Sequence, residues 1–261
     1  MQKNRKYGYL TTESFGEQIE MRKGQNIAGF PIGIIYIEDV YYPMLPGNVV
    51  NGYTYAYPVR LKAVKGLDVP DLFRMGESVY ENIMVACREL EQEGVRAISS
   101  ACGFFGNYHA KVAEQLTIPV ALSSLVQLPW IAALLKPSQR IGVITADQSS
   151  FTEHLLDSCC VPESLKKRLV VKDARQTKEF SCVIEQRGSW DNTAAKEEIV
   201  KLGKEIVQEY PETGAILLEC SDMPPYAYAV QEATQLPVFD FITLINWLEN
   251  SVCQKPYSGF I

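Results

Sequence analysis

Two cysteines occupy the same place in two related stretches of this sequence. Cys102 follows an apolar run that begins at Val95, and Cys220 follows a similar run 118 residues later. Adding 118 to the residue number carries eight of the 24 residues from 97 to 120 onto identical residues, without a gap. The matched residues are Ala97, Ile98, Cys102, Tyr108, Val112, Glu114, Pro119 and Val120. A repeat about half as long as the chain predicts two similar lobes, each offering one thiol from the end of a strand.

Two thiols that face each other across a cleft suit one class of reaction. In an open parallel sheet, ligands bind outside the carboxyl ends of the strands, where both cysteines stand just before helix-like segments. The N–H groups and dipole of a helix start favour an anion, so we expect each thiol pKa to fall from about 8.5 toward neutrality. One thiolate would remove a proton from a carbon acid, and the other thiol would return one to the opposite face. Donors near the strand ends would hold the carbanion. The candidate substrate contacts are Asn51, Ser99, Ser100, Gly103, Thr145 and Ser221.

Each of these residues also has a plain structural reading. Both cysteines could be small core residues, as cysteine often is, but their matched positions argue against this. Asp39 ends the first strand and is either an acid/base helper or a solvated loop carboxylate. Asn51 either contacts a ligand or caps its loop. We expect ordinary packing or surface roles for His109, His154 and the vicinal pair Cys159-Cys160.

Composition excludes several classes of function. A formal charge of −6 and a pI near 5.2 argue against a nucleic-acid partner, which needs a basic surface. No apolar run is long enough to span a membrane and no signal sequence stands at the start, so we expect a cytoplasmic protein without a membrane partner. Seven cysteines without a Cys-x-x-Cys pair predict neither a disulfide framework nor a metal site. No glycine-rich nucleotide motif is present, so no cofactor is indicated.

Strands alternate with helices along the chain of 261 residues, which predicts two α/β lobes with doubly wound parallel sheets and a cleft between them. We expect strands at 30–38, 53–64, 95–101, 119–123, 140–145, 168–173, 214–218 and 236–239. We expect helices from Asp71 to Gly94 and at 107–116, 125–135, 150–158, 192–210, 224–234 and 243–252. If the helix after each repeat crosses to the other lobe, the first lobe comprises 1–123 plus 241–261 and the second 124–240.

The segments around both cysteines resemble known motifs. Ser99-Ser-Ala-Cys-Gly-Phe-Phe105 and Leu217-Leu-Glu-Cys-Ser-Asp-Met-Pro-Pro225 are similar to the two cysteine motifs of the aspartate/glutamate/hydantoin racemase superfamily. The loop Pro46–Asn51 with Tyr57-Pro58, and Arg140–Ala146, are also similar. The resemblance implies two flavodoxin-like lobes and cofactor-independent chemistry with Cys102 and Cys220 as acid and base. Amino-acid racemases of this superfamily carry Asn-Thr after the first cysteine and Thr after the second. This chain has Gly103-Phe104 and Ser221, which sets it apart from that branch.

The sequence therefore predicts a racemase or epimerase of a small carboxylate or amide, of amino-acid or hydantoin type. A related decarboxylase or cis-trans isomerase that uses one cysteine is a second reading, and a small-molecule binding protein without chemistry is a third. The substrate and the oligomeric state stay open, with a homodimer among the alternatives.

Overall fold

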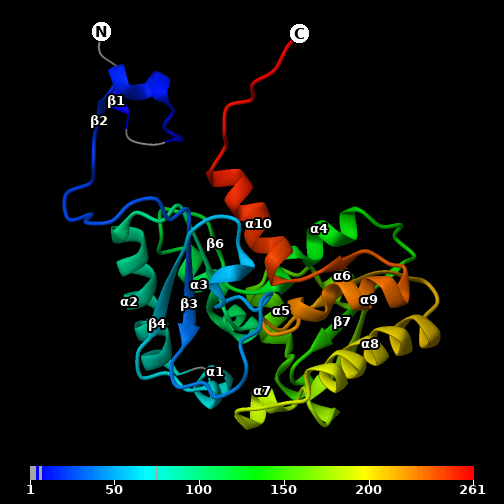
Figure 1. The fold of residues 1–261 in the computed structure, drawn as a ribbon. Helices are drawn as coiled ribbons and strands as arrows, with labels where there is room; N and C mark the ends of the chain where they lie inside the picture. Colours follow the sequence, from blue (N-terminus) through cyan, green and yellow to red (C-terminus); the bar gives the residue numbers. More distant parts are fainter. Residues whose placement is uncertain (1–3, 6–7, 75) are drawn as a thin grey trace.

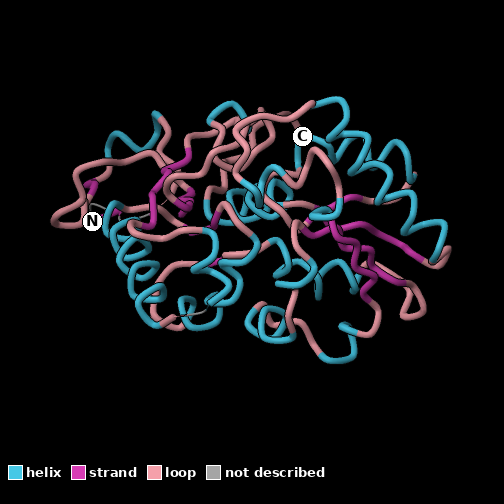
Figure 2. The backbone as a smooth tube through the Cα atoms, turned by 90° about the horizontal axis from the view of Figure 1, so that it is seen from below, coloured by secondary structure: helices cyan, strands magenta, loops and turns pink. Residues whose placement is uncertain are grey.

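Two parallel four-stranded sheets form the centre of the protein. The computed structural model describes residues 4–5, 8–74 and 76–261. The first sheet has the order β4-β3-β5-β6 and the second the order β8-β7-β9-β10, and Figure 2 shows them side by side. Their bounds are β3 Ile32–Ile37, β4 Val59–Val64, β5 Ala97–Ser100, β6 Val120–Ala121, β7 Arg140–Thr145, β8 Leu169–Asp173, β9 Thr213–Leu218 and β10 Val238–Phe239. The prediction of two doubly wound α/β lobes is confirmed.

The sequence repeat corresponds to a structural repeat. In the first lobe β5 leads through Cys102 into the 3-10 helix η3 (Gly103–Tyr108), α3 (His109–Ala113) and β6. In the second lobe β9 leads through Cys220 into the 3-10 helix η7 (Pro224–Tyr226), α9 (Ala227–Thr234) and β10. Both lobes place the strand after the cysteine unit at the same edge of their sheet. The two thiols therefore stand at equivalent carboxyl ends of central strands.

One long helix covers an outer face of each sheet. These helices are α2 (Glu77–Glu93) and α8 (Asn192–Glu209), whose buried residues recur at helical spacing. A glycine permits the close approach in each lobe. A Cβ at Gly33 would come within 2.9 Å of the Leu90 side chain, and one at Gly142 within 2.7 Å of Ile206. Gly33 pairs with Ile98 and Gly142 with Ile216, so the two glycines are equivalent in the repeat.

The helix that follows each repeat lies against the opposite sheet. Phe241, Leu244 and Ile245 of α10 (Phe241–Val252) are buried with Ile32 of β3 and Ala97 of β5. The 3-10 helix η4 (Ser124–Gln127) contacts β9, and α4 (Leu128–Ala133) adds Leu128 and Ile131 to the same apolar cluster as Val143 and Leu217. On these contacts we propose the lobe boundaries 1–123 plus 241–261 and 124–240.

Short helices complete the two lobes. They are α1 (Val69–Arg74) in the first lobe and α5 (Glu153–Ser158), α6 (Glu163–Lys166) and α7 (Cys182–Glu185) in the second. The sequence did not predict α6 and α7, which are only four residues long. The predicted helix from Asp71 to Gly94 is divided into α1 and α2, and Gly76 stands at the N-cap of α2.

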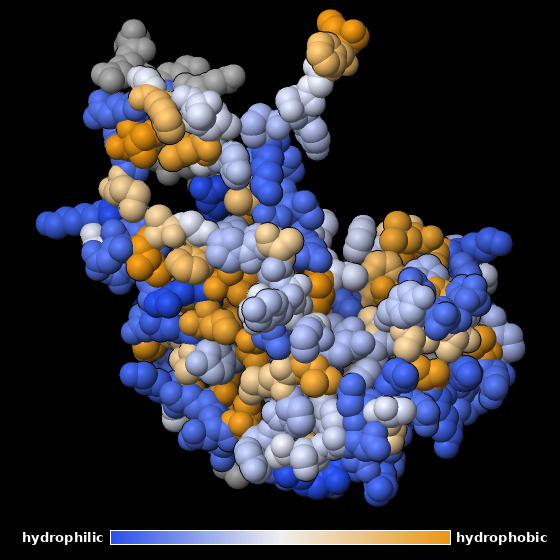
Figure 3. Space-filling model, viewed as in Figure 1, coloured by the Kyte–Doolittle hydropathy of each residue, from blue (hydrophilic) through white to orange (hydrophobic). Residues whose placement is uncertain are grey.

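The two ends of the described chain stand away from the lobes. The short pair β1 (Asn4–Arg5) and β2 (Gln18–Ile19) and the residues after α10 project on the same side of the molecule (Figure 1). Their apolar side chains, including Phe15 and Phe260, are exposed (Figure 3). Arg96 contacts both segments, because its guanidinium donates to the carbonyl of Gly8 at 3.2 Å and lies 4.0 Å from Cys253 Sγ, directly after α10.

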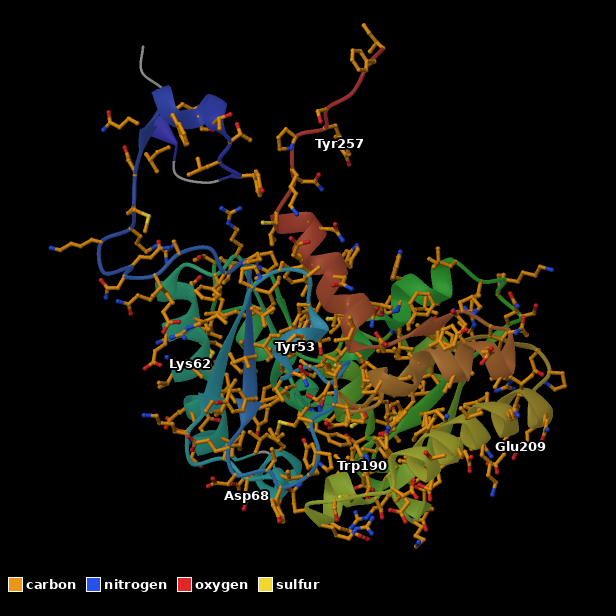
Figure 4. The ribbon with its side chains drawn as sticks, in the orientation of Figure 1. Tyr53, Lys62, Asp68, Trp190, Glu209 and Tyr257 are labelled. Carbon is orange, nitrogen blue, oxygen red and sulfur yellow. The ribbon has the colours of Figure 1, made fainter. Side chains whose placement is uncertain are left out.

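The predicted strand at 53–64 is wrong in its first half. Residues Gly52–Thr54 form a 3-10 helix, and the strand begins only at Val59. The side chain of Asn51 caps this turn by accepting a hydrogen bond from the Tyr53 N–H at 2.9 Å. Tyr53 itself is 94% exposed and lies on the surface (Figure 4). Alternating aromatic residues suggested a strand, but a capped turn satisfies the backbone there instead.

Candidate active site

A small cavity lies between the two lobes, at the carboxyl ends of the central strands. Its volume is about 40 Å³, room for a few water molecules, so we expect the lobes or the loop after β3 to move when a substrate enters. Residues from β3 and the loop after it, from both cysteine units and from α7 line it. They include Tyr36, Tyr42, Met44, Asn48, Ala101, Cys102, Gly103, Phe104, Glu219, Cys220, Ser221 and Asp222.

Cys102 stands at the N-cap of η3 with its thiol inside this cavity. The backbone N–H groups of Phe104 and Phe105 lower the pKa of the thiol, as expected for a helix start. Burial raises that pKa by far more, and the carboxyl groups of Glu219 and Asp222 raise it further. The thiol of the free protein is therefore protonated at neutral pH.

Cys220 lies in the same cavity with a carboxyl group as its hydrogen-bond partner. Its thiol donates to Asp222 Oδ2 at 3.5 Å. Burial, and then the nearby charges of Asp222 and Glu219, hold the pKa of the thiol well above its ordinary value. The prediction of two thiols with lowered pKa values is therefore wrong for the free protein. The dipole of a helix start is worth up to about 1 kcal/mol on a surface, whereas full burial shifts a pKa by several units.

Asp222 is the most heavily hydrogen-bonded group of the site. Its carboxylate accepts hydrogen bonds from Ser221 Oγ at 3.2 Å, from Asn48 Nδ2, from the Tyr42 hydroxyl and from the Cys220 thiol. Burial raises its pKa to about 6, while these donors act in the opposite direction. Asp222 is thus largely ionised at neutral pH and can accept a proton from Cys220.

Glu219 is a second carboxyl group, fully buried between the lobes. Its Oε2 accepts from Thr145 Oγ1 at 2.9 Å, and the backbone N–H of Ala146 also donates to the carboxyl group. Its Oε1 has no hydrogen-bond partner and lies so close to Gly103 that a Cβ there would overlap it. Burial raises the pKa of Glu219 to about 7.

Comparison with known proteins identifies the family of this chain. Residues 61–248 match the family model described as Asp/Glu/Hydantoin racemase. The chain belongs to this family. Its expected resemblance to the aspartate/glutamate/hydantoin racemases is thereby confirmed.

The curated relatives of this chain are named for a lyase reaction and not for racemisation. The chain is 30% identical over 236 residues to dimethylsulfoniopropionate lyase 7 of Emiliania huxleyi, covering 87% of this chain and 69% of that protein. It is 28% identical over 242 residues to a dimethylsulfoniopropionate lyase of Durusdinium, covering 91% and 80%.

Solved structures of the family share the fold. The allantoin racemase from Klebsiella pneumoniae aligns with a TM-score of 0.59 and 15% identity, over 88% of this chain and 96% of that one. Unliganded arylmalonate decarboxylase aligns with a TM-score of 0.56 and 15% identity, over 87% and 94%. At this identity the likeness establishes the two-lobed fold and leaves the substrate open.

Only some of the residues predicted for the site line the cavity. Gly103 and Ser221 lie there with the two cysteines, and Ser221 Oγ also reaches the carbonyl of Ala101 across the lobes at 2.9 Å. Thr145 stands behind Glu219 and contacts its carboxyl group.

The other predicted contacts have structural partners. Ser99 Oγ donates to the Ala121 carbonyl at 2.9 Å and Ser100 Oγ to the Leu122 carbonyl at 2.5 Å, so both tie β5 to the chain beside it. Asn51 caps its loop, and its neighbour Asn48 is the asparagine that reaches the site.

Asp39 lies in a second hollow, together with Asp68 and Asp147. This hollow shares Val40, Val69 and Ile184 with the cavity and therefore adjoins it. Arg175 also lines it and binds Asp147 at 3.0 Å.

The histidines and the vicinal cysteines stand apart from the cavity lining. His109 is buried, which lowers the pKa of its ring, and His154 Nε2 lies 3.2 Å from the Asn107 carbonyl. Cys159 is buried with its thiol 3.8 Å from the Gly106 carbonyl, and Cys160 is exposed.

Sequence reasoning missed the two carboxyl groups and Tyr42. The signal for Glu219 was a charged residue at the end of an otherwise apolar strand, where a buried charge needs a special reason. The signal for Asp222 was an acidic residue two positions after a cysteine. Across residues 4–5, 8–74 and 76–261, no group of three or more His, Cys, Asp or Glu side chains could hold a metal ion. No helix in the same ranges is long and apolar enough to cross a bilayer.

Proposed function

We propose that this protein is a cofactor-independent lyase that acts on a small carboxylate with a leaving group on Cβ. Dimethylsulfoniopropionate is the first candidate substrate, because the curated relatives at 28–30% identity are named for its cleavage. The reaction begins with the step that the sequence predicted, removal of a proton from the carbon beside a carboxylate. It differs in the second step, because a leaving group departs and no proton returns to the carbon.

The unequal surroundings of the two thiols carry this proposal. Backbone N–H groups approach both thiols, but only Cys220 also donates a hydrogen bond to a carboxylate, that of Asp222. A racemase must run from both faces of the substrate and is served by two matched thiols. An elimination needs one base on one side. A proton acceptor beside Cys220 alone therefore favours an elimination with Cys220 as the base.

The charges of the cavity favour a substrate that carries a positive group. Among the described residues that line it, none is Lys, Arg or His, while the carboxylate of Asp222 is present. Its charge raises the pKa of both thiols in the free protein. A sulfonium cation in the cavity acts in the opposite direction, because a nearby positive charge stabilises a thiolate. The substrate itself thereby helps to form the base.

The bonds and protons of the proposed reaction balance. Cys220 passes its proton to Asp222, and the thiolate takes the Cα proton of the substrate. The electron pair of that C–H bond becomes the Cα–Cβ double bond, and the Cβ–S bond breaks with its pair going to sulfur. Dimethyl sulfide and acrylate leave, and Asp222 releases one proton to water.

Product analysis in D₂O tests this function. We expect dimethyl sulfide and acrylate in equal amounts from dimethylsulfoniopropionate, measured by gas chromatography and proton NMR. A panel of enantiopure amino acids, 5-substituted hydantoins and an arylmalonate is run beside it. Cα exchange or racemisation of a panel member without elimination would instead establish a racemase, the kind of enzyme for which the family is named. Binding without any turnover would point to a binding protein.

A further inference from the structure

We infer that Glu219 acts as a neutral carboxylic acid whose Oε1–H donates a hydrogen bond to the carboxylate of the substrate. This inference rests on the proposed function, because it assigns the group that receives the acid end of that substrate. Glu219 is then a catalytic residue, because it contacts the substrate carboxylate, on which negative charge grows as the Cα proton leaves.

The two oxygens of Glu219 have opposite surroundings. Oε2 receives a hydrogen bond from the Thr145 hydroxyl, while Oε1 has no partner although it is buried. A buried oxygen without a partner is costly, so one in the lining of a cavity is a candidate contact for a ligand or a site for a proton. Glu219 lines the cavity, and its Oε1 lies against Gly103 of the opposite lobe.

The two carboxyl groups of the cavity differ in which form their donors stabilise. Asp222 accepts four side-chain hydrogen bonds, which suit an ionised carboxylate. Glu219 accepts only one from a side chain and leaves one oxygen bare, which suits a proton on that oxygen. Burial raises the pKa of Glu219 to about 7 and that of Asp222 to about 6. The carboxyl group with fewer side-chain donors thus has the higher pKa. Carboxyl groups with different environments commonly divide the roles of acid and base.

The cavity needs such a donor. A substrate carboxylate usually meets Arg or Lys, but neither lines the described part of this cavity. A neutral carboxylic acid can donate a hydrogen bond to a carboxylate. That hydrogen bond strengthens as negative charge develops on the substrate carboxylate during removal of the Cα proton. An ionised Glu219 would repel it.

Several titratable groups face Glu219 and bear on its protonation. They are the thiols of Cys102, Cys159 and Cys220 and the carboxylate of Asp147. Burial raises the pKa of all three thiols, so they are neutral near pH 7. Asp147 is ionised and paired with Arg175, and its charge favours the protonated form of Glu219.

Calorimetry with propionate tests the inference without any turnover. Propionate has the acid end of the candidate substrate and no leaving group. Binding is measured at pH 6 to 9 in buffers of different ionisation enthalpy, which gives the number of protons taken up. We expect uptake to approach one proton at pH 8–9 and the Kd to weaken about tenfold per pH unit above about 7, because only the protonated form binds.

Three variants make the outcome decisive. In Glu219→Gln, an amide replaces the acid, so proton uptake and the pH dependence of Kd above 7 should both vanish. In Thr145→Val, a hydroxyl that favours the ionised form is lost, so the rise in Kd should begin at higher pH. In Asp222→Asn, uptake above pH 7 should persist. Circular dichroism and thermal unfolding confirm that each variant is folded.

The inference is overturned if Glu219→Gln still takes up a proton, if uptake vanishes in Asp222→Asn instead, or if propionate does not bind the folded wild-type protein at pH 6. Failure of the proposed function looks different. In that case propionate binding keeps its dependence on Glu219 while dimethylsulfoniopropionate yields no dimethyl sulfide.

Discussion

The two cysteine units share a backbone but differ in chemistry. In the first lobe Cys102 stands between Ala101 and Gly103, with Phe104 after them. In the second lobe Glu219, Ser221 and Asp222 occupy the equivalent positions around Cys220. The strands, 3-10 helices and edge strands that flank the two units are nevertheless equivalent.

The sequence repeat accounts for the positions of the two thiols but does not account for the two carboxyl groups beside them. Equivalent backbones bring two thiols to one cavity, whereas both carboxyl groups come from the second lobe. The glycine of the first unit completes the arrangement, because Glu219 Oε1 occupies the space that a side chain at Gly103 would need. The repeat therefore supplies the cleft, and its departures from symmetry supply a direction for the chemistry.

Removing each thiol in turn gives the largest expected effect. We expect Cys220→Ser to lower kcat for dimethyl sulfide release by at least about 10³-fold, because loss of a positioned base costs about 10²–10⁴. Cys102→Ser should retain at least about a tenth of wild-type activity, since its thiol has no proton acceptor of its own. Equal losses in the two variants would restore the symmetric mechanism of a racemase.

Filling the space at Gly103 should disturb the fold as well as the site. Gly103→Ala forces the Glu219 carboxyl group away from Thr145, and we expect a loss of about 1–3 kcal/mol in the free energy of unfolding. The double variant Gly103→Ala/Glu219→Ala should lose less than the two single variants added together. Urea unfolding measures all four proteins, and strict additivity would mean that the two residues do not share this space.

Glu219 should also make stability depend on pH. Its folded-state pKa of about 7 lies above its ordinary value of 4.5, so the folded state holds the proton more strongly than the unfolded state. The free energy of unfolding should therefore fall by about 2–3 kcal/mol between pH 4.5 and 8 through this group. Glu219→Gln should lack that part of the fall. The exposed variant Glu232→Gln is the control, and its pH dependence should match the wild type.

The smallest expected effect concerns the partner of Cys220. Asp222 must be ionised to accept the thiol proton, so kcat should fall as pH drops through about 6, the pKa that burial gives this carboxyl group. Asp222→Asn should lower kcat about tenfold and remove that acidic limb from the pH profile. Ser221→Ala, which deletes a neighbouring donor at 3.2 Å, should keep the limb. An unchanged profile in Asp222→Asn would assign the limb to another group.

Local pattern was enough to predict the architecture. Continuous apolar runs indicated buried parallel strands such as β9, in which all six residues are buried. Helical spacing predicted α8 to within one residue of its observed end at Glu209. The repeat predicted that Cys102 and Cys220 follow equivalent strands, because a shared sequence spacing produces a shared backbone.

The surroundings of each thiol were decided by the tertiary structure. Burial and the approach of Glu219 and Asp222 raise both thiol pKa values, although backbone N–H groups beside each cysteine act to lower them. Glu219 reaches Gly103 only because β9 and β5 end at the same cleft, a contact between residues 116 positions apart. Sequence spacing determines which side chains a strand presents. The pKa of those side chains depends on desolvation and on charges brought from other strands, and only the packing of the two lobes sets these.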